Sequence, residues 1–569
     1  MSSVFSTICP TVRSVCVTLL LAGLSVVLRA DDHVADLQAE SFATGQPSFG
    51  HWGTDRQNYS AWTTHSNRLI PVYTFGTRQA DGAVNLRHYK GVNSAYRNAE
   101  KLKRIYGRVP ERTLHPTATW MDQTNIADLQ RAAAQAGRKY IFLIVFDGMD
   151  WDTTRAAAIH NTQTISYQKG KGNGTHLQNY TAGGTSQFGL MVTSPHNDGT
   201  TMNADQQTVE NPGGKTFGGY DPAAGGSAPW DTPRDAGYLI SKPAKGNVKH
   251  AYTDSASSAT SMMAGIKTYN NAIGVDPAGN PVPSVAHALQ AEGWAVGIVS
   301  SVPISHATPA CAYAHNVTRK DYQDISRDML GMRSISQPEQ PMAGLDVVLG
   351  GGFGKRQDKD AAQGKNFEAG NVYLADSDLQ AASVDNGGAY VTAVRTSATN
   401  GTQLLADAAK QAVAGKHRLL GFFGVGKYSG HLPYQTADGN FRPVKGVAAK
   451  PESYSEGDIV ENPTLADMTR ASIDVLNSRA DRFWCLVEAG DVDWANHDNN
   501  IDNAIGAVNS GDAAVKVVTD WVENNSSWND ALVIVTADHG HLFQLVEPKK
   551  LIATAESASS DEAGKQQGR

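Results

Sequence analysis

Residues 140–150 read YIFLIVFDGMD. Seven apolar or aromatic residues come first, and Asp147, Gly148 and Asp150 follow them. A short apolar run that ends in turn-forming residues is typical of a strand buried on both faces. Open α/β sheets keep their active sites at the carboxyl ends of such strands. The stretch therefore predicts a buried parallel strand that presents a functional carboxylate at its end.

Similar apolar runs recur along the chain, with amphipathic segments between them. The further strand candidates are WAVGIV (294–299), LDVVL (345–349), LLGFF (419–423), FWCLV (483–487) and ALVIV (531–535). The clearest helix candidates are 125–136, 283–292 and 464–480, the last with the capping pair Thr464 and Asp467. Alternating strands and helices predict the α/β class. We expect a three-layer α/β/α sandwich around a large, mostly parallel sheet.

The composition is that of a large globular protein. The chain has 569 residues, of which 40% are hydrophobic, and its net charge of −7 is spread without long runs. This distribution argues against nucleic acid or an anionic membrane surface as a partner. The cysteines give no disulfide framework, so Cys311 and Cys485 are expected to be buried free thiols.

The two ends of the sequence suggest an export signal and a tail. Arg13 precedes the apolar run 14–28 and Ala30 is a small residue before a cut, so residues 1–30 resemble a signal peptide. A buried N-terminal helix, a single-pass anchor or a lipid on Cys16 are the alternatives. We expect one catalytic domain over 31–555 and a polar tail over 556–569. Long irregular polar stretches predict insertions within 161–250 and 352–462.

Polar residues also follow three of the other predicted strands. They are His306, Thr308 and Arg319 after WAVGIV, Glu488, Asp493 and His497 after FWCLV, and Asp538, His539 and His541 after ALVIV. Each cluster alone is explained by a helix cap or a loop contact. Together they place so much negative charge at one sheet edge that a compensating cation is expected. Asp493 and His497 are four residues apart, so on a helical turn they share one face and can bind one ion.

A further cluster supplies a candidate nucleophile. The run DSASSAT begins at Asp254 and enters a stretch of small residues that favours a helix. Ser255 would then lie at a helix N-terminus, where backbone N–H groups and the dipole favour an anion. Taken alone, a helix N-cap is the better explanation of these residues. Beside the metal-ligand clusters, Ser255 becomes the candidate nucleophile.

Five motifs closely resemble those of metal-dependent alkaline phosphatases and follow the same order. They are FDGMD (146–150), YTDSASSATSMMAGIKTYNNAIGVD (252–276), HATPACAYAHNVTR (306–319), VEAGDVDWANH (487–497) and VTADHGH (535–541). The resemblance implies a site with two zinc ions and one magnesium ion. It also implies a serine nucleophile that becomes a phosphoserine.

The resemblance implies a role for each matching residue. Ser255 corresponds to the nucleophile and Arg319 to the guanidinium that holds two phosphate oxygens. The implied ligands are Asp147, Asp538 and His539 for one zinc, Asp493 and His497 for the other zinc, and Asp147, Thr308 and Glu488 for magnesium. His541 and Asp254 correspond to supporting residues outside the ligand set.

Two positions depart from the family's pattern. His306 stands where many bacterial members carry Asp and animal members carry His. Because magnesium prefers oxygen ligands, the third site could take another divalent metal. Trp494 stands where a Lys or His that contacts phosphate through water is common. We expect altered phosphate affinity and product release from this substitution.

One zinc remains a ligand short, since catalytic zinc normally has three protein ligands. Family members carry the further histidine after the DHxH motif, in a stretch resembling HTxxxVPVYAxG, and no histidine follows His541 here. A similar stretch, THSNRLIPVYTFG (64–76), instead precedes the other motifs, and 91–107 resembles the helix after it. This order predicts a circular permutation, with 62–138 as the moved segment and His65 completing the zinc site. The alternative is that the zinc site is incomplete and that His65 is not a ligand.

The leading functional prediction is an exported alkaline phosphatase, periplasmic or secreted, that hydrolyses phosphate monoesters for phosphate acquisition. A phosphodiesterase or sulfatase of the same superfamily is an alternative. The Ser255 region lacks the sulfatase C/S-x-P-x-R motif, and diesterases usually lack the magnesium ligands. A catalytically inactive exported binding protein is the second alternative. Family members are commonly homodimers, so a homodimer is one expectation, with no membrane partner beyond the export signal.

Overall fold

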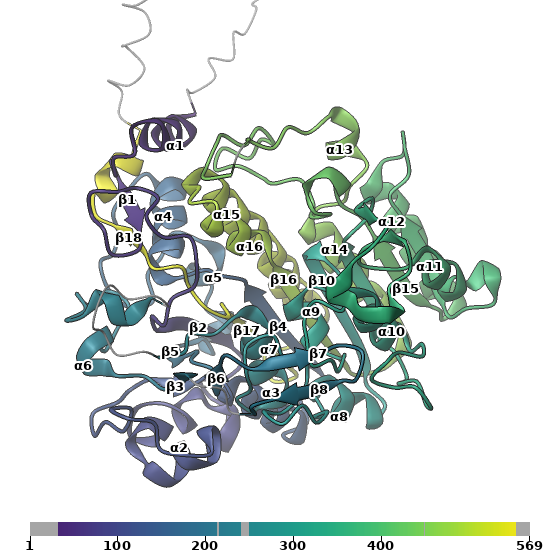
Figure 1. Ribbon diagram of the computed structural model, residues 1–569, viewed down its shortest axis with the longest axis horizontal. Helices are drawn as coiled ribbons and strands as arrows, with labels where there is room; N and C mark the ends of the chain where they lie inside the picture. Colours follow the sequence, from purple (N-terminus) through teal and green to yellow (C-terminus); the bar gives the residue numbers. More distant parts are fainter. Residues whose placement is uncertain (1–31, 213–215, 241–249, 449, 554–569) are drawn as a thin grey trace, which may run out of the picture.

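The computed structural model describes residues 32–212, 216–240, 250–448 and 450–553. Within these residues, ten strands form one large sheet through the centre of the molecule (Figure 1). In spatial order they are β14 (Tyr390–Val394), β15 (Arg418–Phe422), β11 (Val347–Gly351), β10 (Ala295–Pro303), β16 (Phe483–Ala489), β4 (Tyr140–Phe146), β17 (Ala531–Thr536), β2 (Ile70–Phe75), β5 (Gln187–Val192) and β3 (Met121–Asp122). In this described sheet, β2 alone runs antiparallel to its neighbours.

The predicted strands are confirmed. β4 matches its prediction residue for residue, and β10, β11, β15, β16 and β17 differ from theirs by a few residues at one or both ends. The apolar residues of these strands are buried because helices cover both faces of the sheet. The mostly parallel sheet and the α/β class are therefore as expected.

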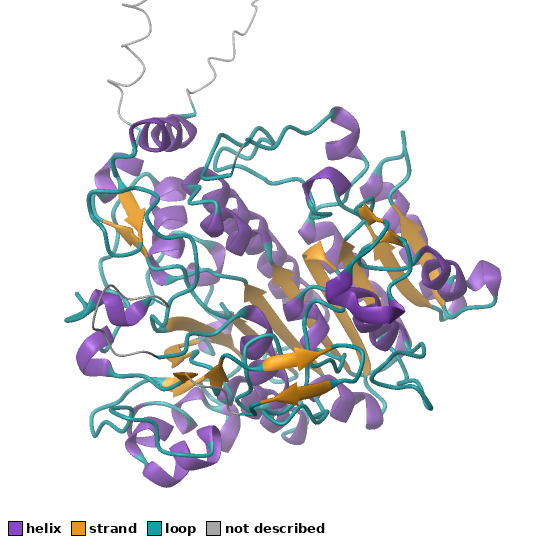
Figure 2. Ribbon diagram, viewed as in Figure 1, coloured by secondary structure: helices purple, strands orange, loops and turns teal. Residues whose placement is uncertain are grey.

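Helices form one layer on each face (Figure 2). One layer contains α4 (Trp151–Thr162), α12 (Gly401–Gly415), α14 (Leu465–Arg479) and α16 (Ile501–Asn525). The other contains α3 (Asn125–Gln135), α7 (Ser255–Ala264), α8 (Val285–Ala291) and α9 (Ala307–Cys311). The three predicted helices are confirmed as α3, α8 and α14, and Thr464 and Asp467 form the predicted capping box.

Smaller elements lie around this sandwich. The remaining α-helices are α1 (His33–Thr44), α2 (Ala99–Tyr106), α5 (His176–Asn179), α6 (Pro222–Gly225), α10 (Tyr322–Leu330), α11 (Asp376–Ala382), α13 (Glu456–Val460) and α15 (Asp491–His497). The short strand pairs are β1 (Gly50–Trp52) with β18 (Phe543–Leu545), β6 (Asn197–Asp198) with β9 (Thr216–Phe217), β7 (Thr201–Asn203) with β8 (Thr208–Glu210), and β12 (Arg356–Gln357) with β13 (Gly370–Asn371).

Two stretches expected to be irregular contribute strands to the main sheet. β5 lies within 161–250 and β14 within 352–462, so the expectation of irregular insertions is wrong at these positions. The apolar residues of β5 (QFGLMV) are interrupted by Gly189, and β14 (YVTAV) is an edge strand with a mixed burial pattern, so neither carries a continuous apolar run. The helix expected over 91–107 is also shorter, because Asn98 caps α2 and two 3-10 turns precede it.

The first and last described segments lie side by side. β1 pairs with β18 in antiparallel register, and His33 Nε2 lies 2.7 Å from the carbonyl oxygen of Lys550. Figure 1 shows α1, β1 and β18 together at one corner of the molecule. Residues 1–30 and 556–569, the predicted signal peptide and tail, lie outside the described residues.

Two further predictions concern cysteines and membranes. Cys311 and Cys485 are buried free thiols, as expected. No helix among the described residues has both the length and the hydropathy that a membrane crossing requires.

Candidate metal and nucleophile site

The sheet topology gathers the predicted site residues at one edge. β10, β16, β4 and β17 are parallel neighbours, so the motifs that follow them meet at their carboxyl ends. β2 runs the opposite way, and its beginning therefore lies at the same edge. Ser66, just before β2, donates its backbone N–H to the carbonyl of Gly540 at 2.7 Å. A residue before β2 thus reaches the residues that follow β17.

Ser255 is the first residue of α7, as predicted. Asp254 is the N-cap, and its side chain accepts a hydrogen bond from the backbone N–H of Ser257 at 3.0 Å. The Ser255 hydroxyl oxygen is buried 3.2 Å from His539 Nε2 and 3.4 Å from Asp147 Oδ1. The hydroxyl therefore combines a helix N-terminus with two potential metal ligands.

The first ligand group surrounds this hydroxyl. His539 Nε2 lies 3.4 Å from both Asp147 Oδ1 and Asp538 Oδ2. The other Asp538 oxygen accepts backbone N–H bonds from Gly148 and His539, whereas Oδ2 is buried without a hydrogen-bond partner. Burial raises the pKa of Asp147 well above its usual range, and Asp538 and Asp493 raise it further. This arrangement of carboxylates favours a bound cation.

The second ligand group contains His65, Asp493, His497 and His541, whose ligand atoms lie within 4.8 Å of one another. His65 Nε2 and His497 Nε2 lie 3.6 and 3.5 Å from Asp493 Oδ1. Asp493 and His497 are on α15, so the prediction that they share a helical face is confirmed. His65 is only 8% exposed, and it lies among these residues rather than at the surface.

Backbone carbonyls orient two of these histidines. His65 Nδ1 lies 3.0 Å from the carbonyl of Thr253, and His497 Nδ1 bonds the carbonyl of Thr63. A carbonyl accepts only, so in a neutral ring each Nδ1 carries the proton and each Nε2 presents a lone pair. The two Nε2 atoms face each other at 3.2 Å. Two facing lone pairs at this distance fit a shared cation.

His541 contacts the second group directly. Its Nε2 lies 2.7 Å from Asp493 Oδ1, closer than any other histidine there. Burial, together with the nearby His497, lowers the pKa of His541 to about 3, so the ring is neutral. A neutral ring that donates to Asp493 orients that carboxylate.

The third predicted site lies at the ends of β16 and β10. Glu488 accepts a hydrogen bond from Ser300, and burial raises its pKa to about 8. The Thr308 hydroxyl on α9 is buried without a hydrogen-bond partner. Two compact groups of ligand atoms are found among the described residues, His65, Asp493, His497 and His541 in one and Asp147, Asp493 and His539 in the other, and neither Glu488 nor Asp538 is part of them. Glu488 and Thr308 therefore lie near the two compact groups, but no third compact group of ligand atoms forms around Glu488 in the described part of the chain.

Arg319 and Asp254 form an ion pair beside the nucleophile helix. Arg319 donates from Nη1 to Asp254 Oδ2 at 3.1 Å, and the same oxygen accepts the backbone N–H of Asn271. Because Asp254 caps α7, the guanidinium is held next to Ser255. The pair is partly exposed, so the guanidinium is accessible to a ligand.

His306 and Trp494 lie side by side near these residues. Their ring centroids are 5.3 Å apart, and His306 stacks on Tyr322. Burial, together with the charge of Arg319, lowers the pKa of His306 to about 3. A neutral imidazole at this position is a poor direct ligand for magnesium.

Divalent metal ions fit this set of side chains. The two compact groups offer histidine nitrogens and carboxylate oxygens, which suit zinc. Thr308 and Glu488 offer oxygens, which suit magnesium. The unpartnered Asp538 Oδ2 and Thr308 Oγ1 are buried acceptors that a cation would satisfy.

Two supporting residues were not predicted. Gly148 has a positive φ of 71°, and a Cβ there would lie 2.7 Å from His541 Nε2 and 2.9 Å from Asp493 Cα. Its place after Asp147 in the quoted motif could have indicated this close approach. Gln123 donates to the Ser258 hydroxyl and to the carbonyl of Asp538 at 2.7 and 2.8 Å. No sequence signal marks Gln123.

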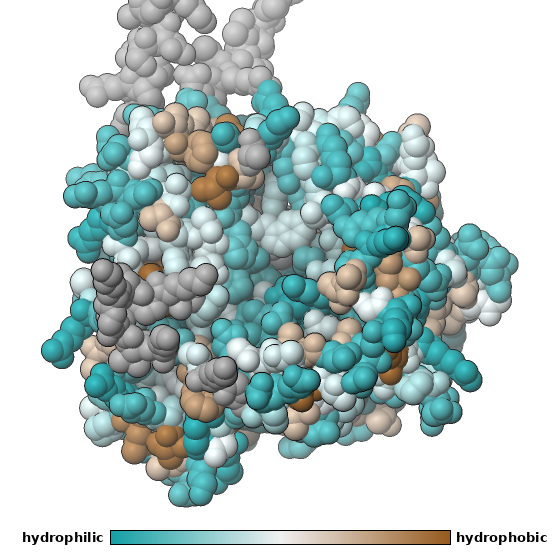
Figure 3. Space-filling view, in the orientation of Figure 1, coloured by the Kyte–Doolittle hydropathy of each residue, from teal (hydrophilic) through white to brown (hydrophobic). Residues whose placement is uncertain are grey.

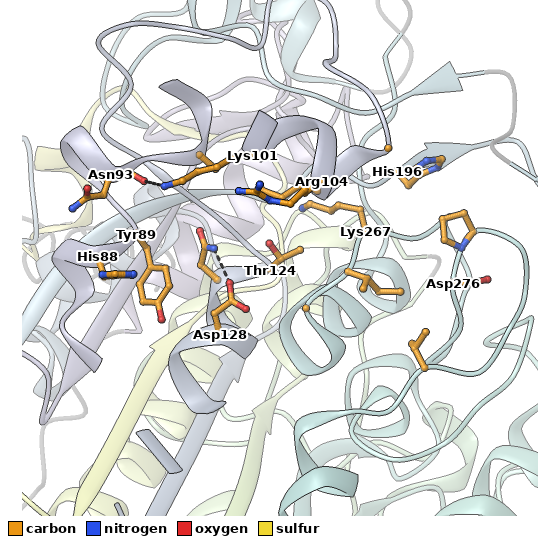
Figure 4. Close-up of a pocket in the computed structure, with 18 residues that line it drawn as sticks. His88, Tyr89, Asn93, Lys101, Arg104, Thr124, Asp128, His196, Lys267 and Asp276 are labelled. Atoms are coloured by element: carbon orange, nitrogen blue, oxygen red, sulfur yellow. Dashed lines mark hydrogen bonds between the residues drawn. The ribbon is translucent and has the colours of Figure 1, made fainter. Parts of the chain in front are cut away.

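A separate cavity of about 680 Å³ lies between α2, α3 and the loop after α7 (Figure 4). Lys101, Arg104 and Lys267 contribute positive charge, and Asp128 contributes negative charge. Lys267 is fully buried 3.5 Å from Asp122, which already balances its charge. None of the predicted site residues lines this cavity.

The alkaline phosphatase family model matches residues 234–565. The chain belongs to the alkaline phosphatase family. The matched region contains Ser255, Arg319 and the motifs that follow β16 and β17. His65 and Asp147 lie before it, although the structure brings both into the site.

Individual members of the alkaline phosphatase family are similar over part of the chain. Alkaline phosphatase 4 of Bacillus subtilis is 31% identical over 287 residues, which are 50% of this chain and 49% of that protein. Alkaline phosphatase of Escherichia coli is 31% identical over 315 residues, which are 52% and 59% of the two chains. This chain therefore spans about half the length of the curated relatives it matches. A solved alkaline phosphatase from the Antarctic bacterium TAB5 has 21% identity and a TM-score of 0.40, covering 71% of this chain and 80% of that one.

Proposed function

We propose that the protein is an exported alkaline phosphatase that hydrolyses phosphate monoesters, in the periplasm or outside the cell, for phosphate acquisition. One observation carries the proposal. The Ser255 hydroxyl lies at the start of α7, 3.2 Å from His539 Nε2 and 3.4 Å from Asp147 Oδ1. A nucleophile, a helix N-terminus and two potential metal-ligand side chains, His539 and Asp147, thus converge at one point.

Three metal sites accompany this proposal. The ligands would be Asp147, Asp538 and His539 for one zinc, His65, Asp493 and His497 for the other, and Asp147, Thr308 and Glu488 for magnesium or another divalent ion. When bound, such ions neutralise phosphate charge and lower the pKa of a bound hydroxyl or water.

The chain's own residues explain the rest of the reaction. Ser255 Oγ attacks the phosphorus atom and forms a phosphoserine while the bond to the leaving oxygen breaks, and that oxygen ends as the protonated alcohol. Water then cleaves the phosphoserine, releasing phosphate and restoring the serine. Backbone N–H groups at the start of α7 and the guanidinium of Arg319 hold the phosphoryl oxygens. Asp254 positions both groups, because it caps α7 and pairs with Arg319.

A circular permutation explains how His65 takes part. The segment that carries His65 and β2 precedes Asp147 in this chain, whereas the family's corresponding stretch follows the DHxH motif. The antiparallel direction of β2 supports the idea, since it brings His65 to the carboxyl ends of β16, β4 and β17. The adjacency of β1 and β18 supports it as well, because joined ends at that corner would restore the other order.

Metal removal and a nucleophile variant test the proposed function. With zinc and magnesium, the protein should release phosphate from an aryl phosphate monoester faster than it cleaves the matching diester or sulfate. A chelator should abolish this release, and added metal should restore it.

Ser255→Ala should lower kcat by about a thousandfold or more. Ser261→Ala is the control, because the Ser261 hydroxyl bonds the Ser257 carbonyl within the same helix, and it should leave kcat near the wild-type value. Metal-independent release, or an active Ser255→Ala protein, would refute the proposal.

A further inference from the structure

A second cavity opens beside the metal-ligand cluster. It has a volume of about 530 Å³, and His497 forms part of its wall. The other walls come from Trp494 on α15 and from the described loop residues 427–448 and 450–452, which include Tyr428, Tyr434, Val444 and Glu452. Figure 3 shows this face of the molecule hollowed near its centre, and α15 lies above and to the left of that place in Figure 1. Ser255 and Arg319 are not in its lining, so the cavity begins at His497, on the edge of the metal-ligand cluster, and extends away from the nucleophile.

Trp494 connects the cavity to the site. It follows Asp493 directly on α15, and it is partly exposed although its neighbours Asp493 and Ala495 are buried. His306 and His431 lie against it, with ring centroids 5.3 and 4.9 Å away. The indole is therefore held in place while part of its surface stays open.

Hydrogen bonds also fix the outer wall. The Tyr428 hydroxyl donates to the Ser453 carbonyl at 3.1 Å, and Lys427 Nζ lies 4.7 Å from the centre of the Tyr428 ring. The Tyr434 backbone N–H donates to the Tyr454 hydroxyl at 3.0 Å. His431 bonds Glu452 at 3.0 Å and packs on Tyr434 at 4.3 Å. These contacts hold aromatic side chains around the cavity before any ligand arrives.

We propose that this cavity is a leaving-group pocket that selects phosphate monoesters whose alcohol carries a flat aromatic ring. The inference rests on the proposed function. A ring entering beside His497 would lie against Trp494, and aromatic faces attract flat rings by stacking. Pro443 and Val444 add apolar surface. Residues 427–448 and 450–452 were predicted only as part of an insertion. In this proposal they set the preference for aromatic over aliphatic leaving groups.

Binding of phosphonates tests the pocket without turnover. Calorimetry on the full-length, zinc-loaded protein would compare phenylphosphonate, ethylphosphonate and inorganic phosphate. In the wild type we expect phenylphosphonate to bind about tenfold more tightly than ethylphosphonate, the size of one stacking contact. Trp494→Leu should remove this preference, and Trp494→Phe, which keeps a flat ring, should retain most of it. Tyr428→Leu, on the far wall, should reduce it and serves if Trp494→Leu does not fold.

The possible binding results distinguish failure of the proposed pocket from failure of the proposed function. Equal affinity of the wild type for the two phosphonates would refute the leaving-group pocket. An unchanged preference for phenylphosphonate in both leucine variants would refute it as well. Neither result contradicts the proposed phosphatase activity. If neither the phosphonates nor inorganic phosphate binds to the zinc-loaded protein, the proposed function itself fails. The ratio of kcat/KM for phenyl phosphate to that for glycerol phosphate should change with the variants in the same direction as the binding preference.

Discussion

His65 and His497 face each other through the same ring atom. Each uses Nδ1 for a backbone carbonyl, so the 3.2 Å between their Nε2 atoms brings two lone pairs together. Asp493 lies within 3.6 Å of both rings. Neutral imidazoles would repel one another in this arrangement, whereas a cation between them would bind all three groups. The local side-chain geometry thus fits a bound metal ion.

Arg319 gives a test at the same scale. If its guanidinium holds phosphoryl oxygens, Arg319→Ala should lower kcat/KM by about a hundredfold to a thousandfold, as loss of a transition-state donor does. Inhibition by inorganic phosphate should weaken as well. Arg319→Lys should recover part of the charge effect but not the planar fork. Steady-state kinetics with phosphate inhibition measure both effects, and wild-type values for Arg319→Ala would remove Arg319 from the site.

The order and direction of the strands bring the site side chains together. β16, β4 and β17 are adjacent and parallel, so three distant motifs share one edge. β2 is antiparallel, so its preceding residues reach that edge. The start of α16 is tied to α1, since the side-chain oxygen of Gln38 accepts the backbone N–H of Ile501 at 2.9 Å. The segment before β2 is therefore braced against the helix that follows α15.

Asp502, in the first turn of α16, predicts a dependence of stability on pH. It is fully buried, Oδ1 accepts the backbone N–H of Ala437 at 3.0 Å, and Oδ2 has no partner. Burial, together with the nearby charges of Asp32 and Asp438, raises its pKa to about 7. The folded protein then binds a proton that the unfolded chain releases, so the wild type loses stability as pH rises from about 4 to about 7.

Asp502→Asn stays neutral throughout that range. It should be more stable than the wild type by about 2–4 kcal/mol at pH 8, and the difference should shrink as the pH falls towards 5. Asp502→Ala also leaves the Ala437 N–H without its acceptor, so its free energy of unfolding at pH 8 should rise less than that of Asp502→Asn. Urea unfolding at the two pH values measures the difference. An equal effect at both values, or a less stable Asp502→Asn at pH 8, would contradict this explanation.

The whole molecule has its first and last described segments in contact. β1 pairs with β18, and His33 lies against Lys550. Closing that corner and opening the chain elsewhere would change the order of the elements without changing their positions. The stretch 111–117 is a suitable place to open it, because most of its residues are partly or fully exposed.

A permuted variant tests this view. Residue 553 would be joined to residue 32 by a short Gly/Ser linker, and new ends would be placed near Arg112. We expect this protein to fold with the same zinc content and with kcat/KM within about threefold of the wild type, since its contacts are unchanged. Zinc analysis, circular dichroism and kinetics report the outcome. A soluble, folded permutant that lacks zinc would show that the chain order itself is needed for the site.

Much of this arrangement could be predicted from the sequence. The buried strands carry continuous apolar runs, and the residues after them carry the chemistry, so β4, β16 and β17 and their motifs were recognisable. β5 and β14 were missed because Gly189 interrupts the large apolar residues of β5, and Thr392 and Ala393 interrupt those of β14, so neither strand is a continuous run of large apolar residues. The contact between His541 and Asp493, and the support from Gln123, depend on packing between distant segments. The cavity beside Trp494 likewise depends on how a polar loop folds back.

We infer that His65, from the segment before β2, completes a zinc site with Asp493 and His497. Zinc content after exhaustive dialysis tests it most directly, comparing the wild type with His65→Ala and with His88→Ala, an exposed histidine of the same segment. We predict that His65→Ala loses one tightly bound zinc per chain and most of its activity, whereas His88→Ala keeps both. Wild-type zinc stoichiometry and activity in His65→Ala would contradict the account.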